Sequence, residues 1–152
     1  MYQIQVASTE EQLSNDTGDI WDSGEVESTE SVNVPFDGSP LETCRKYYWR
    51  VRWWDQLNQV SRYSETATFE TGLLQESDWR AEWIEGKDLF RKQITVNKKV
   101  ESARAYVTGL GFYELNVNGN KIGNHVLDPG WTSYDKLVLY STYDITHDLV
   151  SG

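Results

Sequence analysis

The stretch Ser102–Asp135, SARAYVTGLGFYELNVNGNKIGNHVLDPGWTSYD, holds the strongest local signals in the sequence. Asn118-Gly119 predicts a two-residue hairpin turn, because a type I′ turn needs positive φ at both central residues. The run 113–117 before the turn alternates apolar and polar residues, and Ile122 follows the turn. A hairpin with this tip places Leu115 opposite Ile122 on one face.

The glycines on either side of this hairpin sequence predict changes of chain direction. Gly109 and Gly111 follow the strand pattern of residues 103–108 and predict a bend or bulge before the hairpin. Asp128-Pro129-Gly130 predicts a further turn, which presents Trp131 and Tyr134. This unit is therefore expected to be a compact β-structure with an aromatic loop.

The rest of the chain is also read as strands, with at most a helical turn at residues 9–12. Alternation places Tyr2, Ile4 and Val6 on one face of the first strand. A brief edge strand is expected at residues 20–24, and Pro35 demotes the strand around it to an edge or a strand end. The other predicted strands are 31–36, 47–55, 67–71, 89–96, 102–108 and 137–143. The fold class is all-β.

Composition excludes several classes of protein. The net charge of −10 disfavours nucleic acid and anionic membranes as partners, since both attract clustered Lys and Arg. Cys44 is the single cysteine, so neither a disulfide framework nor a cysteine-based metal site is expected within the chain. No apolar run is long enough for a membrane span, and no signal peptide pattern opens the sequence. A cytoplasmic location is expected, with a secreted parent protein as the alternative.

The strand 47–55 places two arginines among aromatic residues. Arg50 and Arg52 share a face with Tyr48 and Trp54. This pattern is compatible with a nucleic-acid surface, but arginine stems packed over aromatic rings on a sheet explain it better in an acidic chain.

The same strand carries the first family resemblance. Leu41 lies six residues before Tyr47, and this spacing is similar to the tyrosine corner of fibronectin type III and related sandwiches. In that motif the tyrosine hydroxyl bonds to the backbone a few residues upstream. Residues 1–72 resemble a fibronectin III-like sandwich that lacks its first two strands.

The second half extends the resemblance to a particular enzyme family. Together with the first-half motifs at 2–8 and 48–52, the chain resembles the N-terminal region of bacterial α-L-rhamnosidases of glycoside hydrolase family 78. The motifs that carry the resemblance are Trp83-Ile84, residues 89–92 and 105–115, Asn118-Gly119 and residues 127–134.

This resemblance implies two small antiparallel β-sandwich modules, both expected to be incomplete. The first, residues 1–72, is fibronectin III-like. A linker at 73–84 leads to the second, residues 85–152, which is jelly-roll or lectin-like. In the family the catalytic carboxylates lie in a helical (α/α)6 barrel, and nothing here resembles that barrel. No catalytic residue is carried over. The chain is expected to be a non-catalytic accessory fragment, whose parent hydrolyses terminal α-L-rhamnose from glycosides.

Two other functions stay open. Related modules of some rhamnosidases bind rhamnose, in at least one subclass with calcium, and an aromatic platform with nearby amide and carboxyl groups suits a sugar. The candidates are Asn118, Asp128, Trp131 and Tyr134, with Asn116 and Asn124 as oxygen ligands. The alternative assigns these aromatics to packing and Asn118 to its turn.

A protein-interaction sandwich is the other function. Its partners would be the parent's catalytic domain or other chains that meet exposed β-edges, and the isolated chain is expected to dimerise or swap strands. No cofactor is expected other than calcium.

Overall fold

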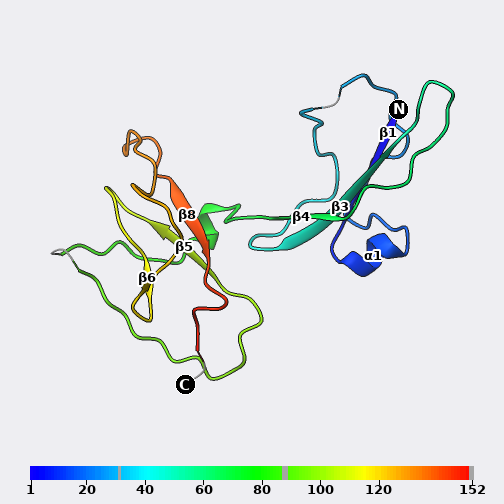
Figure 1. Cartoon of the computed structure of the whole chain (residues 1–152). Helices are drawn as coiled ribbons and strands as arrows, with labels where there is room; N and C mark the ends of the chain where they lie inside the picture. The colour runs from blue at the N-terminus through cyan, green and yellow to red at the C-terminus, as the bar shows by residue number, and fades with distance from the viewer. Residues whose placement is uncertain (31, 87–88, 151–152) are drawn as a thin grey trace. The chain divides into compact units, whose positions relative to one another are not determined.

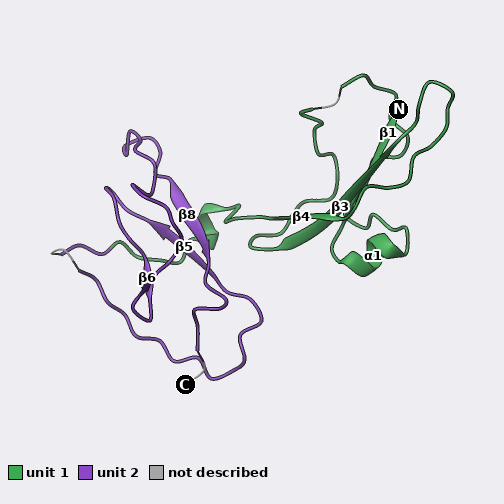
Figure 2. Ribbon diagram, viewed as in Figure 1, with its two compact units in different colours: residues 1–83 green, residues 84–152 purple. Residues whose placement is uncertain are grey.

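The computed structural model describes residues 1–30, 32–86 and 89–150. The chain divides into two compact units, Met1–Trp83 and Ile84–Gly152 (Figure 2). Most of the segment expected to be a linker, 73–84, therefore falls within unit 1. Two hydrogen bonds hold it there, since the Thr43 hydroxyl donates to Asp78 and accepts from the Leu74 N–H. A short 3₁₀ helix, η1 (Glu76–Asp78), lies in this segment.

Unit 1 is built on one antiparallel sheet with the strand order β2-β1-β3-β4 (Figure 1). Its strands are β1 (Tyr2–Ala7), β2 (Trp21–Asp22), β3 (Lys46–Trp53) and β4 (Ala67–Glu70). The short strand at residues 20–24 is an edge strand, as expected. The predicted helical turn is α1 (Glu10–Ser14), whose first turn is capped by the Thr9 hydroxyl.

The centre of unit 1 confirms the tyrosine corner. The Tyr47 side chain is 1% exposed, and its hydroxyl accepts a hydrogen bond of 2.7 Å from the backbone N–H of Glu42. The ring stacks on Phe69 of β4 at a centroid distance of 5.4 Å. Leu13 of α1 and Val6 of β1 are also buried. Tyr47 thus ties the loop before β3 to the core.

The first strand differs from the expectation in one respect. Alternation placed Tyr2, Ile4 and Val6 on one face, but Tyr2 and Ile4 are only half-buried, whereas Gln3 and Gln5 on the opposite face are buried. Gln5 is only 2% exposed. Polar side chains that are hydrogen-bonded can be buried without a large cost, and alternation alone does not reveal such partners.

Unit 2 contains two small antiparallel sheets. The strand β5 (Arg104–Thr108) pairs with β8 (Tyr140–Asp144), and β6 (Asn116–Val117) pairs with β7 (Asn120–Lys121). The hairpin prediction is confirmed, because Asn118 and Gly119 have φ of +50° and +86° at its tip. The Ile122 N–H donates to the Leu115 carbonyl at 2.9 Å, which confirms the predicted pairing of these residues.

Three predicted strands are wrong in whole or in part. Residues 32–36 form no strand, while Ser31 lies outside the described residues. Asn33 has a φ of +57°, which breaks an extended run, and Pro35 has no N–H to give to a ladder. Residues 89–96 also form no strand, and the last strand begins only at Tyr140 rather than at Leu137. An alternating pattern forms a strand only where a partner strand takes up its backbone groups.

The fold class is confirmed. The described chain is nearly all-β, with antiparallel sheets and no long helix, and it is consistent with immunoglobulin-like β-sandwich modules. Within residues 1–30, 32–86 and 89–150, no helix combines the length and the apolar character needed to cross a membrane.

Candidate functional site

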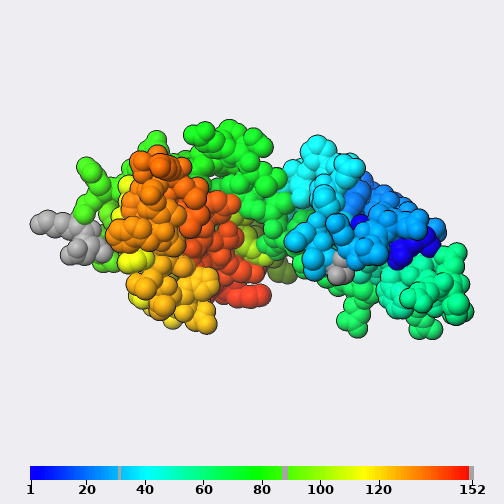
Figure 3. Space-filling view, turned by 90° about the horizontal axis from the view of Figure 1, so that it is seen from above, coloured from blue at the N-terminus to red at the C-terminus, as the bar shows by residue number. Residues whose placement is uncertain are grey.

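Three aromatic side chains gather at the surface of unit 2. Trp131 is 72% exposed and stacks on Tyr134, with ring centroids 5.9 Å apart and planes inclined by 28°. The Phe112 ring centroid lies 5.8 Å from that of Trp131, with the planes inclined by 60°. We call Phe112, Trp131 and Tyr134 the aromatic surface. In the space-filling view the orange atoms, which the colour bar assigns to residues beyond 120, lie at the surface (Figure 3).

Asp128 anchors the loop that leads to the aromatic surface. The Tyr143 hydroxyl of β8 donates to Asp128 Oδ2 at 2.6 Å, and His125 Nδ1 lies 2.8 Å from the same oxygen. The backbone adds a further contact, since the Tyr113 N–H donates to the Asp128 carbonyl at 3.0 Å. The carboxylate is thus already engaged by residues of its own unit.

The protons of this cluster can be assigned from the donors. Tyr143 has one hydroxyl proton, which points to Asp128, and the Tyr113 hydroxyl donates to the Val107 carbonyl at 3.1 Å. Both hydroxyl protons are therefore donated to other acceptors, and neither is available for the 3.3 Å contact between the two hydroxyl oxygens. Cooperative networks of this kind fix the position of each member.

The same contacts shift the pKa values of Asp128 and Tyr143. The hydrogen bond from Tyr143, with a smaller contribution from His125, holds the pKa of Asp128 below its ordinary value. Burial, and then the hydrogen bond to Asp128, raise the pKa of Tyr143 well above its ordinary value. Asp128 is therefore held as an anion and Tyr143 as a neutral donor.

Asn118 serves the hairpin rather than the aromatic surface. Its side-chain Nδ2 donates to the Asp148 carbonyl at 2.7 Å, which ties the hairpin tip to the C-terminal segment. Asn116 lies in β6 opposite Lys121, and Asn124 is exposed. Of the four candidates, the structure brings together Trp131 and Tyr134, next to a loop anchored by Asp128.

No anionic cluster suited to calcium is found among the described residues. In the part of the chain that the structure describes, no three His, Cys, Asp or Glu side chains lie together in a way that could hold a metal ion.

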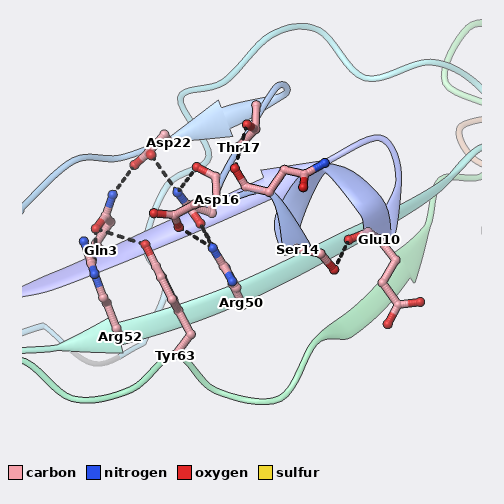
Figure 4. A network of polar contacts seen from close by, with 11 residues as sticks. Gln3, Glu10, Ser14, Asp16, Thr17, Asp22, Arg50, Arg52 and Tyr63 are labelled. Carbon is pink, nitrogen blue, oxygen red and sulfur yellow. Dashed lines mark hydrogen bonds and ion pairs between the residues drawn. The ribbon is translucent and has the colours of Figure 1, made fainter.

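A second polar cluster, across β1, β2 and β3 of unit 1, involves the buried glutamines (Figure 4). Asp22 accepts from Gln3 at 2.7 Å and from Gln5 at 2.9 Å. The glutamine oxygens in turn accept from arginines of β3, Gln5 from Arg50 at 2.7 Å and Gln3 from Arg52 at 2.8 Å. Burial alone would raise the pKa of Asp22, but the two glutamine hydrogen bonds hold it below its ordinary value.

The arginines of this network confirm the packing interpretation of the aromatic strand. Both guanidinium groups lie over the Tyr63 ring, Arg50 at 3.7 Å and Arg52 at 4.6 Å from its centroid. Arg50 also pairs with Asp16. Among the described residues, no buried side-chain polar atom lacks a hydrogen-bond partner. This network joins the side chains of β1, β2 and β3 and stabilises the sheet.

Sequence reasoning missed the partners of Asp128. Tyr143 lies fifteen residues away on β8, and Tyr113 lies on the other side of the hairpin, where an isolated antiparallel bridge pairs it with Asp128. The one local signal was His125, three residues before Asp128.

The class of protein follows from these two units: an immunoglobulin-like module precedes a second β-module with an anchored aromatic loop. Residues 1–75 match the family described as the Rha78A-like, N-terminal immunoglobulin domain. Residues 98–152 match the α-L-rhamnosidase N-terminal domain. The two matches confirm the resemblance of this chain to the N-terminal region of α-L-rhamnosidases that was seen in the sequence.

Similarity to individual proteins supports the same resemblance. An α-L-rhamnosidase of Formosa agariphila is 39% identical over 99% of this chain and 19% of its own length. The solved α-L-rhamnosidase from Dictyoglumus thermophilum is 41% identical with a TM-score of 0.93, over 99% of this chain and 20% of that one. A Streptomyces avermitilis α-L-rhamnosidase complexed with L-rhamnose is 26% identical with a TM-score of 0.52, over 99% of this chain and 17% of that one. The chain thus spans about a fifth of the length of these relatives.

Proposed function

We propose that this chain is a non-catalytic accessory part of an α-L-rhamnosidase, and that the parent protein hydrolyses terminal α-L-rhamnose from glycosides. The observation that carries the proposal is the match of nearly the whole chain to one fifth of the Dictyoglumus thermophilum enzyme. Its role would be to support the remaining polypeptide rather than to cleave the sugar.

The state of the carboxyl groups supports a non-catalytic role. An inverting glycosidase needs a general acid whose pKa is raised, opposite a second carboxylate that activates water. In the described residues, the carboxyl pKa values that depart clearly from the ordinary value are all lowered: those of Asp22, Asp78, Asp128 and Asp144. Hydrogen bonds within the chain hold these four groups as anions, so none of the four is suited to act as the general acid.

A chimera tests the proposal. The matching fifth of the Dictyoglumus thermophilum enzyme is replaced by this chain, and the chimera is compared with the same enzyme lacking that fifth. We expect the chimera to hydrolyse nitrophenyl α-L-rhamnoside and to survive heating longer than the shortened enzyme. A shortened enzyme as active and as heat-resistant as the chimera would contradict an accessory role.

Sugar binding is the second candidate, and the exposure of Trp131 favours it. A ring that is 72% exposed and stacked on a second aromatic can accept the C–H face of a sugar. The related Streptomyces avermitilis structure contains L-rhamnose.

Calorimetric titration of this chain with L-rhamnose, with and without calcium, tests it. Saturable heat that Trp131→Ala abolishes would establish a lectin-like module. The matched control is Trp83→Ala, since Trp83 is also exposed but lies in unit 1. If no heat is detected at millimolar sugar, the accessory role remains and sugar binding is rejected.

A further inference from the structure

The tip of the β6–β7 hairpin places a side-chain amide beside an unhindered backbone nitrogen. Asn118 is the one asparagine of the sequence that a glycine follows, and both residues are exposed. Apart from its two chain neighbours, Gly119 has no atom within 4 Å of the position that a Cβ would take. Its N–H donates none of the hydrogen bonds described for the chain. The Gly119 nitrogen is therefore open to attack on the neighbouring amide.

One described contact holds the Asn118 side chain. Its Nδ2 donates to the Asp148 carbonyl oxygen at 2.7 Å. Since a carbonyl oxygen only accepts, the side chain must present its NH₂ group there, and an ionised carboxylate has no proton to offer in its place. The tie between the hairpin and the C-terminal segment therefore depends on Asn118 remaining an amide.

The hairpin that carries Asn118 is short. Its strands β6 and β7 have two residues each. Two-stranded hairpins are marginally stable on their own, and exposed elements with few contacts open locally much more often than a whole unit unfolds. Each such opening would free the Asn118 amide from the Asp148 carbonyl and let its carbon approach the Gly119 nitrogen.

We propose that Asn118 is a site of spontaneous deamidation, with water as the co-reactant. The Gly119 nitrogen loses its proton to solvent and attacks Cγ of Asn118; a C–N bond forms, and the side-chain nitrogen leaves as ammonia. Water then opens the five-membered succinimide ring at either carbonyl, which leaves aspartate or isoaspartate at position 118. The new carboxyl group is ionised at neutral pH and adds one negative charge to the net charge of −10.

Deamidation releases the C-terminal segment from the hairpin. A carboxylate at position 118 faces the Asp148 carbonyl oxygen with no proton between the two acceptors. The remaining backbone contact of Asp148 is its own N–H, which donates to the Ile145 carbonyl at 3.1 Å. The loss of one hydrogen bond is expected to increase the opening of this segment about fivefold.

Asn58 is the matched control for the reaction. It is exposed and has a φ of +61°, close to the +50° of Asn118. The next residue, Gln59, carries a side chain, and its N–H donates to Asp55 Oδ1 at 2.8 Å. The folded chain is incubated at mildly alkaline pH, and peptide mass mapping with isoaspartate detection follows both sites. We expect Asn118 to convert before Asn58, and a chain that converts Asn118 no faster than Asn58 would overturn the proposal.

Asn118→Asp reproduces one product and tests the release. Hydrogen exchange of the Asp148 amide should be about fivefold faster in this variant than in the unmodified chain, because exchange follows the population of the open form. Asn58→Asp adds the same charge in unit 1 and should leave that exchange unchanged. Equal exchange of the Asp148 amide in all three proteins would show that deamidation does not release the segment.

Discussion

Replacing Tyr47 with phenylalanine removes one hydroxyl from the centre of unit 1. The change deletes the acceptor of the 2.7 Å hydrogen bond from the Glu42 N–H and leaves the ring, stacked on Phe69, in place. Because the side chain is 1% exposed, water cannot easily replace the lost oxygen. We expect a loss of about 1–2 kcal/mol in the free energy of unfolding of unit 1.

Denaturant and thermal unfolding of the whole chain measure this loss. For a unit of this size, a loss of about 1–2 kcal/mol lowers the melting temperature by about 4–16 °C. Tyr48→Phe is the matched control. It makes the same chemical change at the next residue of β3, and the Tyr48 hydroxyl takes part in none of the hydrogen bonds described for residues 1–30, 32–86 and 89–150. Equal unfolding free energies for the two variants would refute the role of Tyr47 as the tie between loop and core.

The remaining predictions concern unit 2. Tyr143→Phe removes the donor to the Asp128 carboxylate and should cost about 1.5–3 kcal/mol in denaturant unfolding, as for other hydrogen bonds to charged groups; no change would show that the contact is not stabilising. Since folding lowers the pKa of Asp128, its contribution is complete above the ordinary aspartate pKa of about 3.9 and is lost as the pH falls through the lower folded value. Acid titration followed by circular dichroism should therefore show that Asp128→Asn is less stable at pH 7 but less sensitive to acid, and an unaltered acid profile would contradict this. Gly119→Ala should cost about 1–2 kcal/mol at φ +86°, although no atom lies within 4 Å of the added carbon, and a neutral result would mean that the turn relaxes.

Local chemistry explains what could be predicted from the sequence. The turn at Asn118-Gly119 depends on backbone preferences of two residues, so it is visible without any partner. The tyrosine corner joins residues only five apart, Glu42 and Tyr47, and is visible for the same reason. Arginine stems over aromatics on β3 follow from composition within one strand and a nearby loop.

Features that depend on a partner could not be predicted. Residues 89–96 were predicted as a strand but pair with no other strand among the described residues, so prediction and structure disagree there. The burial of Gln3 and Gln5 depends on Asp22 of another strand, and the anchoring of Asp128 depends on Tyr143. Contacts of this kind are set by strand order, which alternation does not encode.

In the candidate site, too, local contacts could be predicted from the sequence and contacts with distant residues could not. Trp131 and Tyr134 are three residues apart, and their stacking was accessible to local reasoning. Asn118 was grouped with them because it is a polar turn residue, but its side chain bonds to the Asp148 carbonyl. The expected self-association of the isolated chain remains a prediction, and sedimentation across concentration measures it.

The most direct test of the accessory role is a paired hydrolysis assay on nitrophenyl α-L-rhamnoside. The isolated chain and the chimera with the Dictyoglumus thermophilum enzyme are measured side by side. The account predicts no turnover by the isolated chain at any pH and turnover by the chimera. Turnover by the isolated chain that is lost on substitution of one of its own carboxylates would contradict it.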